Sequence, residues 1–103
     1  MGRDPKSMSL SRSVRVVNEA GLHARPCHAI VSAAISYPCS LRIRRAGEEA
    51  SGVNGKSILE LMTLEARLGV ELELTADGED AEALLGELEG LFASGFGERE
   101  PQG

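Results

Sequence analysis

The chain has 103 residues, a formal charge of −5 and a pI near 5.0. A chain of this length builds one domain with a small core, which leaves little room for a deep active-site cleft. The acidic balance, with no Trp, one Tyr and two Phe, argues against a nucleic-acid binder, which needs basic charge and stacking rings.

The two ends and the cysteines bear on where the protein works. The apolar runs are too short to cross a bilayer, and Met1–Ser13 lacks the apolar stretch of a signal peptide. Cys27 and Cys39 are too few for a disulfide framework, so reduced thiols in the cytoplasm are expected.

Composition also predicts the domain bounds. Glycine, proline and serine near the start predict a flexible arm over residues 1–12, and glycines with charges predict a flexible tail over residues 95–103. The folded domain is therefore expected at residues 13–94.

The first elements are a strand and a helix. Ser13–Asn18 carries three valines, which is typical of a strand, and Gly21 ends it. Ala24–Ser36 is expected to be helical, and Pro38 stops it. The apolar stripe of this helix has i, i+3, i+4, i+7 spacing and consists of Cys27, Ile30, Val31 and Ala34.

A hairpin and a second helix follow. Leu41–Arg44 alternates apolar and basic residues, and Ala50–Asn54 is expected to return beside it as a weak strand. A helix is expected over Lys56–Leu68, capped by Gly69 in the left-handed conformation.

The last strand and helix give the clearest patterns. Val70–Thr75 alternates strictly, and Ala81–Ala93 has a continuous apolar stripe at helical spacing. The order βαββαβα predicts an α+β open-faced β-sandwich, with a four-stranded antiparallel sheet and three helices on one face.

Chemistry concentrates in Gly21-Leu22-His23-Ala24-Arg25-Pro26. Gly21 allows a sharp exit from the strand and Pro26 suits a first helical turn, so His23 should lie beside the helix N-cap. Free backbone amides and the helix dipole favour an anion there, and Arg25 adds a cation suited to phosphate. An isolated segment of this kind is more often an ordinary turn; its setting between a strand and a helix favours a phosphate site on a nucleophilic imidazole.

These residues resemble the HPr family, the histidine-containing phosphocarriers of the bacterial phosphoenolpyruvate-dependent phosphotransferase system. The resemblance runs from about Val14 to Phe92. Gly21–Pro26 matches the phosphorylation signature of the family, Val53–Ile58 its serine-site region, and Thr75–Ala81 its turn into the last helix.

The resemblance implies a mechanism. His23 would accept a phosphoryl group on Nδ1 from the phosphohistidine of Enzyme I, which draws on phosphoenolpyruvate. It would pass the group to a histidine of an EIIA-type protein, in sugar uptake or its regulation, while Arg25 steadies the phosphoryl group. The chain is thus expected to be a monomeric carrier without metal or cofactor, and not an enzyme with its own small-molecule substrate.

The second helix suggests a docking surface. On a helical projection Leu61, Leu64 and Leu68 share a stripe that can face the sheet. The adjoining apolar stripe exceeds the usual core-facing arc and should be partly exposed, which favours partner docking over cover by the tail or another copy. The resemblance implies one docking face that comprises Ala24, His28, Ile58, Leu59 and Met62.

Ser57 opens the second helix, where its plain role is an N-cap. In some relatives the matching serine is phosphorylated by a dedicated HPr serine kinase, which weakens docking at the histidine. Regulatory phosphorylation of Ser57 is therefore a hypothesis that the resemblance supplies.

Three departures from the family pattern stand out. The stretch Gly47–Val53 is about three residues longer than the hairpin of the family, Glu65 stands where many relatives have Gly, and Ala20 replaces a polar residue before the Gly-X-His segment. None removes the phosphorylation motif.

Three alternatives are weaker. A metal site on His23, Cys27 and His28 is disfavoured, because the two histidines would lie about 140° apart on a helix. A structural domain with a chance motif is disfavoured by three matching blocks. An HPr-like regulatory module that docks without relaying phosphate remains the main alternative, and retention of His23 and Arg25 argues against it.

Overall fold

The computed structural model describes residues 9–98, which form seven helices and strands and one short turn of 3₁₀-helix. In chain order these are β1 (Ser9–Arg15), α1 (Ala24–Ala34), β2 (Ser40–Arg45), β3 (Val53–Asn54), α2 (Ile58–Met62), β4 (Glu71–Asp77), α3 (Ala81–Ala93) and the turn Gly95–Gly97.

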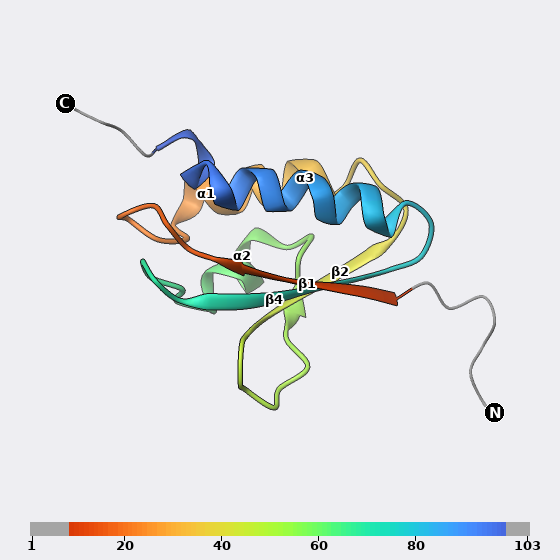
Figure 1. Cartoon of the computed structure of the whole chain (residues 1–103), viewed down its shortest axis with the longest axis horizontal. Helices are drawn as coiled ribbons and strands as arrows, with labels where there is room; N and C mark the ends of the chain where they lie inside the picture. The colour runs from red at the N-terminus through yellow and green to blue at the C-terminus, as the bar shows by residue number, and fades with distance from the viewer. Residues whose placement is uncertain (1–8, 99–103) are drawn as a thin grey trace.

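The strands form one antiparallel sheet in the order β1-β4-β2-β3 (Figure 1). Figure 1 shows α1 and α3 side by side over one face of this sheet. The helix α2 packs beside α1 and β3. The predicted fold class, an α+β fold with a four-stranded antiparallel sheet and three helices, is confirmed.

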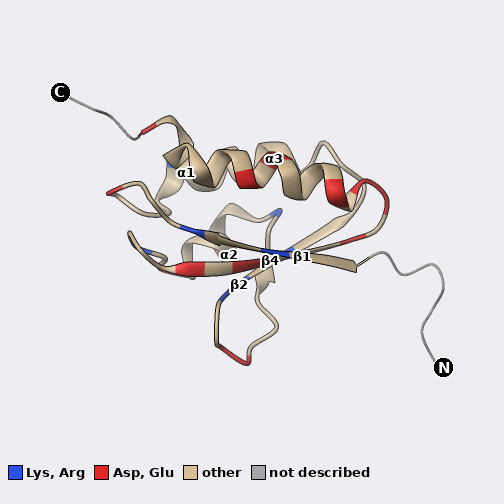
Figure 2. Cartoon of the chain, viewed as in Figure 1, with Lys and Arg blue, Asp and Glu red and all other residues tan. Residues whose placement is uncertain are grey.

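The core lies between the sheet and the helices. Alternate residues of the central strand β4, Leu72, Leu74 and Ala76, are fully buried, as the strict alternation of its sequence predicts. The opposite face is polar, and there Arg15 forms an ion pair with Glu71 and Arg44 one with Glu73. Figure 2 shows further acidic residues on α3 and on the loop before it.

The first strand begins earlier than predicted. β1 spans Ser9–Arg15, not Ser13–Asn18, because all seven residues pair with β4, from Ser9 opposite Asp77 to Arg15 opposite Glu71. The serines Ser9, Ser11 and Ser13 lie on the exposed face, so that part of the strand lacks an apolar signal. Of the predicted arm over residues 1–12, residues 1–8 lie outside the described part of the chain.

The second helix is much shorter than predicted. α2 ends at Met62 with Thr63 as its C-cap, and Glu65 has a left-handed φ of +50° that no helix tolerates. Leu61 and Leu64 are buried as expected, but Leu68 is 54% exposed because the chain has left the helix. Gly69 does have a positive φ of 93°, yet it pairs with Val16 instead of capping a helix.

The first residues of the predicted tail make defined contacts. Gly95 is buried, and the ring of Phe96 packs edge-on against Phe92 with centroids 4.9 Å apart. The apolar contact of one aromatic residue orders a segment whose composition resembles a linker. The rest of the predicted tail, residues 99–103, lies outside the described residues.

Two glycines on the exposed face of α3 are expected to destabilise the helix. Gly86 and Gly90 lie inside the helix, and a Cβ on either would meet no atom within 4 Å. Each Gly→Ala change should therefore raise the free energy of unfolding by about 0.5–1 kcal/mol, measured by urea denaturation. Gly21→Ala should instead lower the free energy of unfolding, because Gly21 has φ +72° and a Cβ added there would lie 2.6 Å from the carbonyl oxygen of Ala66. A loss of stability in the α3 variants would contradict this account.

Candidate functional site

His23 is the N-cap of α1, as the sequence predicts. Its backbone is extended, with φ −88° and ψ −166°, and its own side chain makes no capping hydrogen bond. The first amides of a helix have no intrahelical acceptor, and α1 has no acidic residue in its first turn. The start of α1 therefore presents free donors and a positive dipole end beside the imidazole.

Gly21 fixes how the chain reaches this N-cap. Its positive φ and its close approach to Ala66 exclude any side chain. The next residue, Leu22, donates its amide to the carbonyl of Ala66 at 2.9 Å, and Leu22 itself is buried. The segment before α1 is thus tied to the loop after α2, which places His23 and α2 on the same side of the molecule.

The nearest neighbour of the His23 ring is a residue that the sequence analysis assigned to the tail. The carboxylate of Glu98 lies 3.0 Å (Oε2) and 3.2 Å (Oε1) from His23 Nε2. Asn18 donates from Nδ2 to Glu98 Oε1 at 3.1 Å, and Arg25 Nη1 lies 3.8 Å from Oε2. One carboxylate thus joins three residues that could contact an anion.

These contacts change the acidity of the carboxylate. Partial burial raises the pKa of Glu98, but hydrogen bonds from His23 and Asn18 and the nearby Arg25 outweigh burial and leave the pKa lowered. The Glu98 side chain is only 16% exposed, whereas that of Arg25 is 76% exposed. Glu98 is therefore a fixed part of the site, and Arg25 a largely solvated one.

The predicted docking residues lie as expected on the surface. Ala24 and His28 are exposed on α1, Leu59 is 79% exposed and Met62 42% exposed on α2, and Ile58 is half-buried. Since α1 and α2 pack side by side, these residues belong to two neighbouring elements.

Ser57 is the N-cap of α2 and accepts a hydrogen bond from the Glu60 amide at 3.2 Å, which confirms its predicted capping role. Glu60 in turn accepts from the amide of Asn54 at 2.9 Å, so the cap also ties β3 to α2.

The described residues hold no group of three or more His, Cys, Asp or Glu side chains arranged to bind a metal ion. Cys27 is buried within α1, and burial raises the pKa of its thiol to about 11, so it is an unreactive core residue at neutral pH. His28 is exposed, as predicted.

The comparisons with known proteins agree with the geometry. Residues 10–94 match the family model described as the PTS HPr component phosphorylation site. The chain belongs to the HPr family. It is 41% identical to phosphocarrier protein HPr of Treponema pallidum over 84% of this chain and 96% of that protein. The corresponding protein of Pseudomonas aeruginosa is 39% identical over 84% and 94%.

A solved structure supports the same assignment. The crystal structure of HPr-C-His from Thermoanaerobacter tengcongensis superposes with a TM-score of 0.80 and 31% identity, covering 88% of this chain and 99% of that one. This HPr-family chain is a phosphocarrier of the phosphotransferase system, and membership implies Enzyme I and EIIA-type proteins as its partners. In the described residues no helix is long and apolar enough to cross a membrane.

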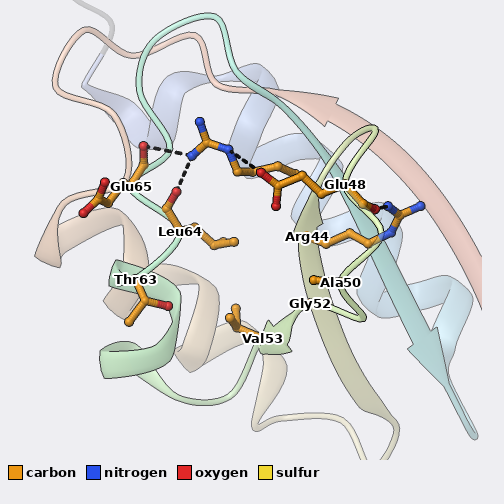
Figure 3. Close-up of a pocket in the computed structure, with 9 residues that line it drawn as sticks. Arg44, Glu48, Ala50, Gly52, Val53, Thr63, Leu64 and Glu65 are labelled. Atoms are coloured by element: carbon orange, nitrogen blue, oxygen red, sulfur yellow. Dashed lines mark hydrogen bonds and ion pairs between the residues drawn. The ribbon is translucent and has the colours of Figure 1, made fainter.

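Two residues in segments that the sequence analysis expects to depart from the HPr pattern line one pocket. A pocket of about 420 Å³ lies between the β2–β3 hairpin and the loop after α2, and Glu48 of the hairpin and Glu65 of the loop both line it (Figure 3). Its two arginines are engaged: Arg44 binds Glu73 and the Glu48 carbonyl, and Arg45 binds Glu48 and the carbonyl of Leu64. The contacts of Arg45 thus join the hairpin to the loop that carries Glu65.

Sequence reasoning missed Asn18 and Glu98. Asn18 was expected to end a strand, but it is buried and its Nδ2 donates to the Gly21 carbonyl at 2.8 Å as well as to Glu98. The usable signal for Glu98 was Phe96, an aromatic residue two positions earlier in an otherwise polar tail. Its packing on α3 determines where Glu98 lies.

The lowered pKa of Glu98 predicts a pH-dependent contribution to stability. A carboxyl group whose pKa is lower in the folded state stabilises fully above its ordinary value of 4.5, and this stabilisation is lost as the pH falls through the folded-state value. The difference in unfolding free energy between the wild type and Glu98→Gln should therefore shrink on acidification from pH 7 to pH 3, as measured by urea titration at each pH. A difference independent of pH would mean that the charge of Glu98 contributes nothing.

Proposed function

We propose that His23 is the residue on which this HPr-family protein carries the phosphoryl group, through Nδ1. The observation that supports this most is the position of His23 at the N-cap of an uncapped helix, with a side chain that is 42% exposed. A neutral imidazole nitrogen is a good nucleophile at neutral pH, and the half-exposed ring is accessible to a partner.

Arg25 is proposed to stabilise the transferred group. It lies in the first turn of α1 and extends into solvent, with its guanidinium 3.8 Å from the carboxylate that contacts His23. A guanidinium donates several hydrogen bonds in one plane and matches phosphate oxygens, while the first amides of α1 add the favourable end of the helix dipole. No metal or cofactor is needed for this transfer between histidines.

The carrier role is tested by incubating the protein with phosphoenolpyruvate and Enzyme I. We expect intact mass to rise by one phosphate that is labile in acid, in the wild type and in the control His28→Ala, but not in His23→Ala. Arg25→Ala should slow the transfer by roughly 10- to 100-fold, less than the loss of a buried oxyanion donor, because Arg25 is solvated.

A folded wild type that accepts no phosphate from Enzyme I would contradict the proposal. The remaining interpretation would then be a regulatory module that docks without relaying phosphate.

We further propose that Enzyme I and the EIIA acceptor dock on the exposed apolar residues of α2 together with the start of α1, and that the carrier acts as a cytoplasmic monomer. Leu59 and Met62 are exposed apolar side chains of α2, which packs beside α1, and burying such side chains favours association. The flexible Met62 side chain suits a surface that must fit two different partners.

Leu59→Asp should weaken docking without loss of folding, since Leu59 is 79% exposed. A matched control is Ile35→Asp: Ile35 is 64% exposed but lies just past the far end of α1, roughly 18 Å along the helix from His23. We expect Leu59→Asp to raise the concentration of protein at half-maximal transfer from Enzyme I about tenfold, and Ile35→Asp to leave it unchanged. Equal effects of both changes would exclude α2 as the docking element.

Ser57 is proposed as a regulatory site for a serine kinase. A phosphate at the start of α2 would add negative charge to the edge of the docking face, next to Ile58 and Leu59. In the same transfer assay Ser57→Asp should slow phosphorylation of His23, whereas Ser57→Ala should not. A normal rate for Ser57→Asp would remove this proposal.

A further inference from the structure

The segment after α3 is built to place a carboxylate at His23. Gly95, Phe96 and Gly97 have consecutive positive φ angles of 64°, 57° and 75°. A left-handed conformation is unfavourable for a bulky residue such as Phe, and it persists only where the surrounding packing holds it. Here the edge-on contact with Phe92 and the hydrogen bond from the Glu98 amide to the Gly95 carbonyl, at 2.9 Å, hold the turn.

The contact to His23 is directional. An ionised carboxylate only accepts hydrogen bonds, so the ring nitrogen that faces Glu98 must carry a hydrogen. That nitrogen is Nε2, 3.0 Å from Oε2. A neutral imidazole carries one N–H, and a hydrogen on Nε2 leaves the lone pair on Nδ1.

We propose that Glu98 is a positioning residue for phosphoryl transfer: it accepts a hydrogen bond from Nε2 of His23 and thereby holds the tautomer in which Nδ1 is the free nucleophile. The inference rests on the proposed function, namely phosphorylation of His23 at Nδ1. Asn18 supports the same arrangement indirectly, because its Nδ2 fixes Glu98 Oε1 at 3.1 Å while also binding the carbonyl of Gly21.

The role fits the chemistry of the transfer. The P–N bond of the phosphohistidine on Enzyme I breaks as the P–Nδ1 bond to His23 forms, and Nε2 keeps its hydrogen throughout. No proton has to move on His23. Electron density leaves the ring as the new bond forms, so Nε2–H becomes a stronger donor and its bond to the carboxylate strengthens during the reaction.

A competing role for Glu98 predicts the opposite effect of its removal on the rate of phosphoryl transfer. The carboxylate also lies 3.8 Å from Arg25 and could act as a built-in anion that occupies the phosphate donors and inhibits transfer. Its closest contact, however, is with Nε2 and not with the guanidinium, and Arg25 remains 76% exposed. Removal of an inhibitory carboxylate would speed transfer, whereas removal of a positioning carboxylate slows it.

The tautomer is measured directly by ¹⁵N NMR of the ring nitrogens of His23 at neutral pH. We expect the Nε2–H form to dominate in the wild type, and the ratio of tautomers to shift by about tenfold or more towards Nδ1–H in Glu98→Ala. His28 lies in the same samples as an internal control, and its tautomer ratio should not change. A wild-type ring that is mainly Nδ1–H would overturn the proposal without recourse to any variant.

The second readout is single-turnover phosphorylation by phospho-Enzyme I. Glu98→Ala and Glu98→Gln should lower the rate constant at saturating donor, with little change in the donor concentration at half-saturation. The matched control, Glu82→Gln, alters an exposed glutamate in the first turn of α3 and should transfer at the wild-type rate. Circular dichroism confirms that each variant is folded.

The outcomes separate the two proposals. If the wild type gains no phosphate on His23, the carrier assignment fails, while the tautomer measurement still stands. If the wild type is phosphorylated and the Glu98 variants keep its tautomer ratio and rate, only the positioning role is refuted. A faster transfer in Glu98→Ala would replace positioning with inhibition.

Discussion

The contact between Gly21 and Ala66 is the constraint on which the rest of the site depends. No side chain fits at Gly21, and the amide of Leu22 donates to the Ala66 carbonyl across this close approach. The contact joins two loops that are 45 residues apart in sequence, one before α1 and one after α2. Because it sets where α1 begins, it also determines where the imidazole of His23 and the free amides of the first turn lie relative to the exposed face of α2.

Asn18 and Glu98 complete this arrangement from the buried side of His23. Asn18 is 1% exposed and bonds both the backbone of the turn and the carboxylate of Glu98. The buried amide holds the carboxylate, and the carboxylate in turn meets an imidazole nitrogen, so each group fixes the position of the next. The segment after α3 thus contributes to the site as much as the segment before α1 does, although about 75 residues separate the two in sequence.

The sequence predicted the elements whose pattern is local. The apolar stripe of Ala81–Ala93 gave α3 with its observed bounds, and the start of α1 followed from Gly21 and Pro26. The predictions from the sequence were wrong where tertiary contacts determine the path of the chain. The leucine spacing of α2 continues beyond its end, but the left-handed Glu65 and the pairing of Gly69 with Val16 take the chain out of the helix. Likewise, His23 and Arg25 are recognisable in a short motif, whereas Glu98 reaches them only because Phe96 packs on Phe92.

A relay protein must release what it binds, and the distribution of exposure around His23 fits that requirement. Glu98, which contacts Nε2, and Asn18, which holds Glu98, are both largely buried, and their contact with the ring lies away from the nitrogen proposed to react. The cation that would meet the phosphoryl group, Arg25, is largely in water, where its attraction for an anion is screened. A buried guanidinium would bind the phosphoryl group several kcal/mol more tightly and slow its departure to the next partner. A reversible carrier therefore needs a nucleophile that is held in place and a phosphoryl group that is bound weakly.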